Sequence, residues 1–557
     1  MKKVLILTSI LLAGTWHAVL GQFVEGIGDP NVQIGRSVQT VSNNRFIIAG
    51  AISGNTPFGQ IDANVTLANG NGGVVWSTAI GDARNDIFNS IRETGITFIP
   101  SRFVAAGSTR SFGFGSEDMY LVGIDGTGFP QFARVYGGAN RDVGYCVQRI
   151  THFPTQQPGY VIVGETRSFS NFLQGSNVYV VRTDANGNSL DQAVVGTPGE
   201  DIGYWIEQTR DGGYLIAGTT SWRCEDLDSV ENRNIFVARL DADLNMVWNT
   251  IISGPGNEED VAYCVRENTI NNSIIVTGNT RSFGNESQVF LLNLDPLGGF
   301  NWMNVYGGHR RDYGQNVLIT QGPFNQPQYL VAGFSDSYNS TFNFDAMMFK
   351  TTMGGNVLWT RIYGGLNTEY GYEVDDIPTA AAGLPGYVLT GLTESFGAGD
   401  TNILLVRTNN LGQTGGTCEL SIQQGPDMVT PCRTSGAQSV PVNSWTIIPY
   451  DGKPLQYTRF ACQPTSGTQS EIEVETSVPS NITVGPNPTT SDVHFNVDAS
   501  FEGSAVSVMN GSGTVVHTTT ISGEQATIDL NGLMPGIYIA KVIKPDGSVV
   551  TIRILKK

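Results

Sequence analysis

A pattern of about 57 residues occurs seven times in this chain, and a repeat of that length usually corresponds to one supersecondary unit stacked on copies of itself. Each copy contains an apolar run that ends in glycine. Because the runs follow one another at nearly constant spacing, the repeat determines an architecture, although it does not indicate a reaction. The seven runs are residues 46–50, 103–107, 160–164, 214–218, 274–278, 329–333 and 387–391.

Each repeat reads as four short strands without a long amphipathic helical pattern. The first strand follows an acidic residue and alternates polar with apolar positions, as in residues 142–147, 201–206 and 260–265. The second and third strands are uninterrupted apolar runs, which indicates that both of their faces are covered. The fourth strand carries an aromatic residue and often ends in Tyr-Gly-Gly, as at residues 136–138 and 306–308.

Turn sequences separate the third strand from the fourth. Residues 125–128 and 184–187 read Asp-Gly-Thr-Gly and Asp-Ala-Asn-Gly, which accept the positive φ angles of tight hairpins. Four antiparallel strands form one blade of a propeller. The sequence therefore predicts an all-β fold, with a seven-bladed β-propeller over residues 22–412 and a small C-terminal β-sandwich.

An open solenoid of β units is the alternative architecture. The seventh repeat reaches Gly412 without a Trp or Tyr-Gly-Gly strand of its own, whereas residues 23–27 supply a strand before the first repeat. We expect this N-terminal strand to complete the last blade, because closure removes the exposed edges of an open array. The repeats resemble those of secreted bacterial β-propeller proteins over residues 22 to about 412, a resemblance that implies the fold and no particular activity.

The N-terminal end of the chain indicates export. Residues 1–21 combine Lys2 and Lys3 with an apolar stretch and small residues before a cleavage point, which is the pattern of a signal peptide. No other stretch reaches the roughly 20 apolar residues that span a bilayer. We therefore expect a secreted protein without membrane insertion.

Residues 481–557 form a separate predicted domain, reached through a cysteine-containing segment and linker at 413–480. The domain opens with Val-Gly-Pro-Asn-Pro and contains a Pro-Gly-Ile-Tyr strand and a basic end. It resembles the type A C-terminal sorting domain of type IX secretion cargo in Bacteroidetes; an ordinary adhesive sandwich is the alternative. The resemblance implies the type IX secretion machinery as a partner, and release or attachment at the cell surface after passage through the periplasm. Its motif residues are Pro486, Asn487, Pro488, Gly536, Tyr538, Lys556 and Lys557.

Charge and cysteine content restrict the partners and the covalent structure. A formal net charge of −18 disfavours nucleic acid and anionic membranes, and leaves neutral glycans, cations and proteins as ligands. Cys146 and Cys264 occupy the same strand position two repeats apart, beyond the roughly 7 Å that a disulfide spans. We expect both to be buried free thiols. The pairing of the other four, which an oxidising compartment allows, stays open: Cys224, Cys418, Cys432 and Cys462.

An acidic residue recurs at the start of the first strand. A ring of such carboxylates could bind a metal or act in catalysis, but a residue required by every blade more often satisfies turn amides. We therefore predict a structural role, and expect no metal, no cofactor and no catalytic residue here. The positions are Asp86, Asp142, Asp201, Asp260, Asp312 and Glu369, with Gln33 in the first repeat.

A Thr-Arg-Ser-Phe motif follows several of the apolar runs. It lies between strands two and three, on the same face as the connections between blades, where aromatic rings with neighbouring arginines suit sugar or peptide recognition. The alternative is that Thr and Ser close the turn and Phe packs between blades. The predicted ligand-binding residues are Arg110, Phe112, Arg167, Phe169, Trp222, Arg281, Phe283 and Phe396.

The sequence favours binding over catalysis. It contains no visible Ser-His-Asp set, zinc-ligand spacing or phosphate loop. We expect a secreted or cell-surface binding or adhesion protein whose propeller face binds a glycan or a protein. A secreted glycan-active hydrolase or lyase is the competing hypothesis, because the acidic residues offer many carboxylate pairs.

Overall fold

The computed structural model is all-β, with 41 strands and no α-helix among the residues described. It divides between Thr465 and Ser466 into two compact units. The predicted signal peptide at 1–21 lies outside the described residues. The structure describes residues 22–461 without 29–30, 54–60, 97–98, 152–156, 170–174, 198, 223–232, 255–257, 284–285, 323–325, 339–341, 379–384, 399, 415–418, 423–426, 429–431, 435–437, 442–452 and 455–457, and residues 482–556 without 486–491, 498–500, 510–514, 524, 532, 534–535 and 546–548.

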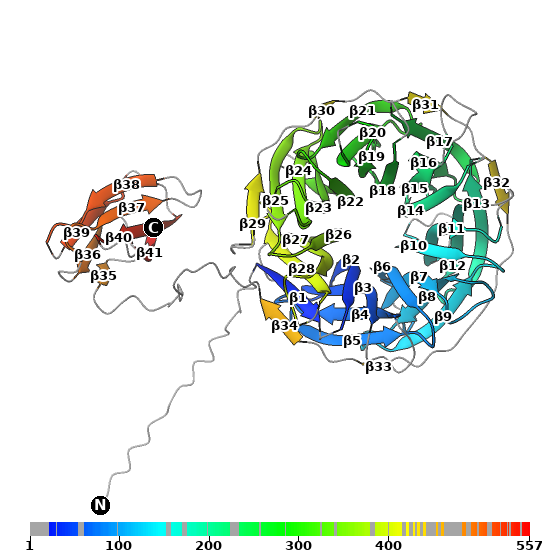
Figure 1. Ribbon diagram of the computed structural model, residues 1–557, viewed down its shortest axis with the longest axis horizontal. Coiled ribbons are helices and arrows are strands. Elements are labelled where there is room, and N and C mark those ends of the chain that lie inside the picture. The colour runs from blue at the N-terminus through cyan, green and yellow to red at the C-terminus, as the bar shows by residue number, and fades with distance from the viewer. Residues whose placement is uncertain are drawn as a thin grey trace, which may run out of the picture. The chain divides into compact units, whose positions relative to one another are not determined.

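The first unit contains antiparallel sheets built from four strands each, arranged like propeller blades around an axis (Figure 1). We number these sheets 1 to 7 along the ring. Sheets 1 to 4 are β2 (Gln33–Val41), β3 (Arg45–Ser53), β4 (Ile61–Ala68) and β5 (Val74–Ile80); β6 (Asp86–Glu93), β7 (Phe103–Thr109), β8 (Asp118–Ile124) and β9 (Pro130–Tyr136); β10 (Asp142–Arg149), β11 (Gly159–Thr166), β12 (Asn177–Asp184) and β13 (Ser189–Gly196); and β14 (Asp201–Gln208), β15 (Tyr214–Thr220), β16 (Asn234–Leu240) and β17 (Met246–Ser253).

The remaining three sheets follow the same plan. Sheets 5 to 7 are β18 (Asp260–Glu267), β19 (Ile274–Thr280), β20 (Gln288–Leu294) and β21 (Phe300–Tyr306); β22 (Asp312–Gln321), β23 (Pro327–Ser335), β24 (Asp345–Thr352) and β25 (Val357–Tyr363); and β26 (Glu369–Ile377), β27 (Gly386–Thr393), β28 (Asn402–Asn409) and β1 (Phe23–Gly28).

The first strand of each sheet is the innermost, and each contacts the inner strand of the next sheet. β26 contacts β2, so the ring closes. The predicted role of the N-terminal strand is confirmed, because β1 pairs antiparallel with β28 from Phe23 opposite Arg407 to Ile27 opposite Ile403. Val24 and Ile27 are buried there.

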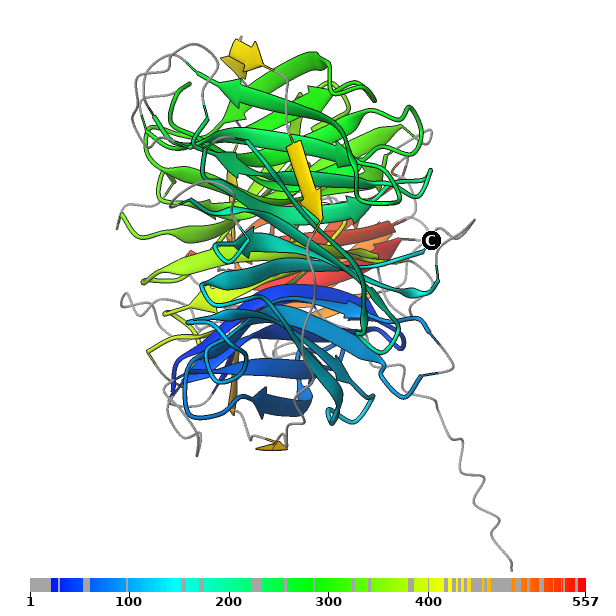
Figure 2. The same cartoon turned by 90° about the vertical axis from the view of Figure 1, so that its right-hand side faces the viewer.

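A run of short strands after Gly412 adds a fifth strand to most sheets. It travels round the periphery in the reverse direction, visiting sheets 6, 5, 4, 3, 1 and 7 in turn (Figure 1), and Figure 2 shows several of its yellow and orange strands at the outside of the sheets. We call these six strands the belt; they cover edges that would otherwise be open to pairing. The belt consists of β29 (Glu419–Ile422), β30 (Asp427–Met428), β31 (Cys432–Thr434), β32 (Gln438–Pro441), β33 (Lys453–Pro454) and β34 (Thr458–Ala461).

The belt was not predicted from the sequence, and it makes β34 rather than β1 the outermost strand of sheet 7. Sheet 2 has four strands among the described residues. Cys432 begins β31, but the side chains of the belt and Cys224, Cys418 and Cys462 lie outside the described residues. The pairing of these four cysteines therefore stays open.

Neighbouring sheets are joined through the tyrosine of Tyr-Gly-Gly in one sheet and the hairpin glycine of the next. The tyrosine of Tyr-Gly-Gly donates to the carbonyl of the hairpin glycine in the next sheet: Tyr306 to Gly355 at 2.8 Å and Tyr363 to Gly412 at 2.6 Å. Gly412 has φ +71, and a Cβ there would lie 2.6 Å from the indole of Trp359. The turn glycine is thus needed for its left-handed backbone and for the space that the preceding sheet's aromatic ring occupies.

The second unit contains two antiparallel sheets around their own apolar core, which includes Phe495, Val508 and Tyr538. Tyr538 is therefore a core residue, and Lys556 donates to the carbonyl of Leu530. Gly536 begins β40, whereas Pro486, Asn487, Pro488 and Lys557 lie outside the described residues. The strands are β35 (Ile482–Gly485), β36 (Asp492–Val497), β37 (Ala505–Met509), β38 (Val515–Thr520), β39 (Gln525–Asp529), β40 (Gly536–Ile543) and β41 (Val549–Lys556).

Candidate functional site

The loop face of the first unit is the side where the inner strands begin and where strands two and three are connected. The recurring acidic residue lies there as the centre of a turn. Asp260 accepts hydrogen bonds from the hydroxyls of Thr280 at 2.5 Å and Ser282 at 2.7 Å, and from the backbone amides of Arg281 and Ser282. Asp312 and Glu369 accept equivalent bonds. The predicted structural role of these carboxyls is confirmed.

Burial changes the acidity of these turn carboxyls. It raises the pKa of Asp201 to about 7, that of Asp312 to about 6 and that of Glu369 to about 7, while hydrogen bonds from the turn oppose the shift. The buried site disfavours the charged form of the carboxylate. These groups therefore titrate near neutral pH although they serve the fold.

The predicted ligand-binding residues divide into two groups on the loop face. The aromatic members pack inward: Phe112 lies 5.9 Å from the ring of Tyr120, Phe169 lies 5.6 Å from Tyr179, and Phe396 is only 5% exposed. Trp222 and Phe283 are partly buried against the core. The arginines, in contrast, are exposed: Arg110, Arg167 and Arg281.

These arginines and others form ion pairs with glutamates on the loop face. Arg281 lies 3.6 Å from Glu258, and Arg233 lies 3.4 Å from Glu259. Arg141 pairs with Glu165, which also accepts a hydrogen bond from the Tyr145 hydroxyl at 3.1 Å. The exposed pairs of Arg281 with Glu258 and Arg233 with Glu259 stabilise the fold little, but they present donors and acceptors without net charge.

Sheets 6 and 7 add an aromatic cluster that was not predicted from the sequence. We use that name for five half-buried rings, with centroids 4.9 Å apart between Tyr313 and Phe334 and 4.5 Å apart between Phe334 and Tyr370. Phe344 and Tyr372 complete the cluster. The available signal was that Tyr313 and Tyr370 occupy the position directly after the turn carboxyl, where the other repeats have Ile or Val.

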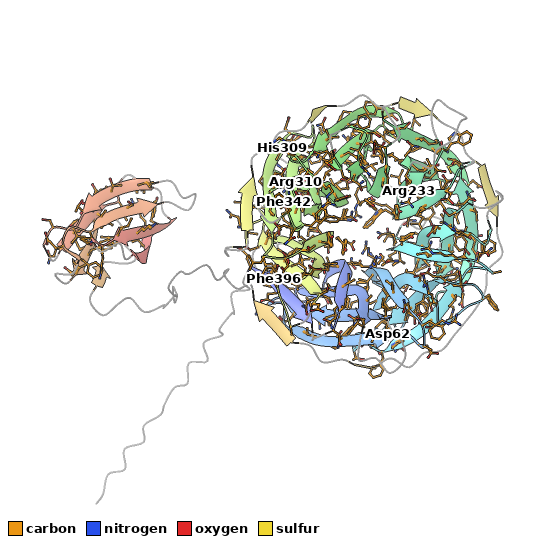
Figure 3. All side chains as sticks on the ribbon, viewed as in Figure 1. Asp62, Arg233, His309, Arg310, Phe342 and Phe396 are labelled. Atoms are coloured by element: carbon orange, nitrogen blue, oxygen red, sulfur yellow. The ribbon has the colours of Figure 1, made fainter. Side chains whose placement is uncertain are left out.

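Arginine side chains pack on aromatic rings at and beside this cluster. The Arg310 guanidinium lies 3.6 Å from the ring centre of Phe342, which is 59% exposed (Figure 3). Arg311 lies over Phe344 at 4.6 Å and forms an ion pair with Asp336 at 2.7 Å. Arginine over an aromatic face is a combination that recurs in recognition surfaces.

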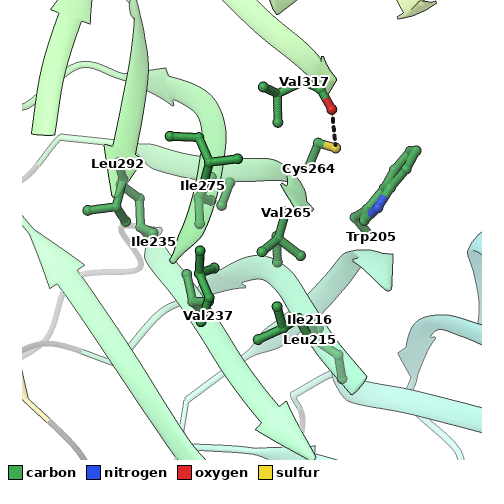
Figure 4. Packing of buried hydrophobic residues seen from close by; sticks show 14 of the residues in the cluster. Trp205, Leu215, Ile216, Ile235, Val237, Cys264, Val265, Ile275, Leu292 and Val317 are labelled. Atoms are coloured by element: carbon green, nitrogen blue, oxygen red, sulfur yellow. Dashed lines mark hydrogen bonds between the residues drawn. The ribbon is translucent and has the colours of Figure 1, made fainter. Parts of the chain in front are cut away.

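Polar side chains of the inner strands join neighbouring sheets around the axis. Ser37 accepts from the amide of Ile91 in sheet 2, and Glu373 accepts from the amide of Val38 in sheet 1. Cys146 and Cys264 occupy the same position and donate to carbonyls of the next sheet, as Figure 4 shows for Cys264 and Val317. Both cysteines are free and buried, as predicted.

Deeper along the axis, side chains from four sheets meet in what we call the axial plug. Arg92 of sheet 2 forms an ion pair with Glu373 of sheet 7 at 2.8 Å. The indole of Trp205 in sheet 4 has the Arg92 guanidinium 5.4 Å from its centre and that of Arg266 in sheet 5 at 4.6 Å. Because these residues come from opposite sides of the ring, the plug fills the axis below the loop face.

The opposite face, which carries the hairpins, contains a cavity of about 930 Å³ between sheets 4 and 5. Its walls include Trp248, Leu297 and the ion pair of Arg239 with Asp211. Leu297 is 82% exposed. This cavity lies away from the predicted residues and provides a comparison site for experiments on the loop face.

No group of three or more His, Cys, Asp or Glu side chains suited to a metal ion occurs among the described residues. The same residues contain no helix that has the length and apolar character needed to cross a membrane.

Comparison with known proteins identifies the second unit. Residues 483–557 match the family model of the secretion system C-terminal sorting domain. The chain carries a secretion sorting domain. This domain marks the protein for type IX export, to the cell surface or outside the cell.

Other comparisons add little to this. One similar solved structure is PorZ, an essential surface component of the type-IX secretion system of Porphyromonas gingivalis, at 11% identity and a TM-score of 0.20, covering 95% of this chain and 99% of that one. At that TM-score the similarity supports no argument about this chain. No curated protein matches the sequence.

Proposed function

We propose that the first unit is a closed seven-bladed β-propeller that acts as a binding or adhesion module outside the cell. Residues 22–412 would form the propeller and residues 413–480 the belt and linker. Residues 481–557 would form a β-sandwich that directs export. A signal peptide at 1–21 would start that route. The ligand is a glycan or a protein held on the loop face.

The observation that carries this proposal is the aromatic cluster of sheets 6 and 7. Five half-buried rings in contact, near the partly buried Arg310 and the exposed Phe342, are more than sheet packing requires, because the other sheets have aliphatic residues at the Tyr313 and Tyr370 positions. Aromatic and arginine side chains supply much of the energy of recognition surfaces. The predicted residues Arg110, Arg167 and Arg281 extend the same face.

Catalysis by carboxylates, the competing function, has weaker support. The carboxyls of Asp201, Asp312 and Glu369 have the raised pKa expected of a general acid. They are fully buried and already accept several hydrogen bonds within turns. A glycan-active hydrolase or lyase would need a carboxylate that reaches the substrate, so we favour binding.

Two exposed apolar residues on opposite faces test the proposal. The mature chain is applied to an array of glycans and extracellular matrix proteins, together with Phe342→Ala and, as the matched control, Leu297→Ala. We expect Phe342→Ala to reduce the strongest signal several-fold and Leu297→Ala to leave it unchanged. Binding that is lost with Leu297→Ala and kept with Phe342→Ala would assign the ligand to the hairpin face and contradict the proposal.

A further inference from the structure

Every inner strand contains a β-bulge at the same place. The pairing register shifts by one residue between the third and the fifth position of each strand, for example between Gly203 and Trp205. The extra residue is left out of the ladder and its side chain is re-aimed. We call the seven extra residues the inner rim; they are Arg36, Asn89, Tyr145, Tyr204, Tyr263, Gln315 and Tyr372.

The inner rim differs from its neighbours in the strand because its residue type varies: four strands have tyrosine there, and the other three have Arg36, Asn89 and Gln315. Three positions before it lies the turn carboxyl or Gln33, and two positions after it lies Val or Ile in all seven strands. Every sheet has the same backbone bulge, but its side chains differ: Asn89 donates to the carbonyl of Gly144 in the next sheet, whereas Tyr145 donates to Glu165. Because the same bulge also forms with arginine, asparagine or glutamine, it does not require the tyrosines of three consecutive sheets, which are therefore available for binding.

We propose that the inner rim binds the terminal sugars of a neutral glycan, which names a ligand class for the binding function proposed above and rests on it. Three consecutive sheets place their rim tyrosines in contact. The ring centroid of Tyr204 lies 5.1 Å from that of Tyr145 and 5.1 Å from that of Tyr263. All three rings are half-buried. Such an arc of rings is a stacking surface for the C–H faces of a sugar.

The charges beside the arc favour a neutral ligand. Glu165 and Glu259, which flank the tyrosines, are paired with Arg141 and Arg233. The exposed pair of Arg233 and Glu259 can exchange hydrogen bonds with sugar hydroxyls, whereas Glu165 is buried and accepts from Arg141 and Tyr145; neither pair presents net charge. The chain as a whole carries a formal charge of −18, which disfavours an anionic ligand.

The bulges disfavour an extended peptide at the same place. A peptide that binds by adding a strand needs an uninterrupted row of backbone donors and acceptors along a strand edge. The bulge interrupts that row in each of the seven inner strands. Side-chain recognition of a compact, polyhydroxylated ligand is therefore the better fit.

The axial plug limits the depth of the site. Trp205 follows Tyr204 directly in the strand, and its indole contacts the guanidinium groups of both Arg92 and Arg266. A ligand that enters from the loop face meets this plug one residue below the rim. The rim therefore suits the end of a glycan chain rather than a chain threaded along the axis.

The test titrates the full mature chain with five neutral hexasaccharides: cellohexaose, maltohexaose, mannohexaose, xylohexaose and chitohexaose. Each is measured by calorimetry against the wild type, Tyr204→Ala, Tyr204→Phe and Phe342→Ala. We expect at least one sugar to bind, Tyr204→Ala to weaken it about ten-fold or more, and Tyr204→Phe, which keeps the ring, to weaken it about three-fold or less.

Hydroxyl-radical footprinting of the wild type keeps the test decisive if Tyr204→Ala does not fold. The bound sugar should protect Tyr145, Tyr204 and Tyr263 from oxidation. The inference is overturned if a sugar binds without this protection, or if none of the five binds. If Phe342→Ala abolishes binding and Tyr204→Ala does not, the binding function is supported and the rim proposal is rejected. If neither a glycan nor a protein binds on the array, both proposals are rejected.

Discussion

The turns that begin the inner strands use an acidic residue in six of the seven sheets, whereas the residues on the axis differ more between sheets, with tyrosine at four rim positions and arginine or an amide at three. At the junctions, Tyr306 and Tyr363 donate to the hairpin glycine of the next sheet, and Asp260 and Asp312 hold equivalent turns. On the axis, the rim holds tyrosine, arginine or an amide, and the plug combines two arginines with Glu373 and Trp205. The residues of the turns and junctions are those that each sheet needs for packing, whereas the residues of the rim are those that the assembled ring presents to a ligand.

The largest expected effect comes from opening the ring. Deletion of residues 22–30 removes β1, opens one edge of β28, leaves β34 without its partner strand, and exposes apolar surface that Val24 and Ile27 cover. At about 2 kcal/mol for each buried side chain, the loss exceeds roughly 4 kcal/mol. Thermal unfolding should begin far below that of the full chain, and a synthetic peptide of residues 22–30 should restore part of the stability. An unchanged melting temperature would contradict closure by β1.

Removal of one turn carboxyl should have the next largest effect. Asp260→Ala leaves the hydroxyls of Thr280 and Ser282 and two backbone amides without their acceptor in a buried place. We expect a loss of roughly 3 kcal/mol in the free energy of unfolding, measured with denaturant. Arg281→Ala in the same loop is the matched control and should cost less than about 1 kcal/mol. Equal losses for both variants would contradict the structural role of the turn carboxyl as a hydrogen-bond acceptor.

The hydrogen bond between adjacent sheets should contribute less. Tyr363→Phe keeps the buried ring and removes only the hydroxyl that donates to Gly412. The expected loss is about 1 kcal/mol in denaturant unfolding. Tyr306→Phe, which breaks the equivalent bond to Gly355, should give a similar value. A loss at one junction and none at the other would show that the junctions are not equivalent.

The smallest stability effect concerns pH. Because the folded pKa of Asp201, Asp312 and Glu369 lies near 6 or 7 and the unfolded value near 4, the folded chain binds more protons between these limits. Stability is then fully present below about pH 4 for these groups and is lost as pH rises through 6 to 7. The melting temperature should be higher at pH 5 than at pH 8 by roughly 2–4 °C. Asp201→Asn should reduce this difference; a higher melting temperature at pH 8 would contradict the assignment.

Much of the fold could be predicted because repetition multiplies each local signal. The apolar runs, the hairpin glycines and the turn carboxyls occur in most repeats, so one repeat supports the interpretation of the next. The belt gives no such signal: β30 and β33 are two residues long, and their partners β21 and β5 are far away in sequence. Short strands of this kind are determined by the open edges that they meet rather than by their own composition.

The candidate site was only partly predictable for a related physical reason. The Thr-Arg-Ser-Phe motif is conspicuous because it repeats, yet Phe112 and Phe169 pack against the core. Tyr145 and Tyr204 stand in the same visible strand pattern, but the bulge that aims them at the rim appears only in the pairing register. Contacts between sheets, such as Phe334 with Tyr370, require the assembled ring.

The most direct test of the distinction between junction and axis is an exchange within the chain itself. Tyr204→Asn places in sheet 4 the residue that sheet 2 already has at the same bulge, Asn89. The measurement is the affinity for the bound hexasaccharide, with the melting temperature recorded on the same sample. Our account predicts an affinity lowered about ten-fold or more, at a melting temperature within about 2 °C of the wild type. An unchanged affinity with a melting temperature lowered by several degrees would contradict it.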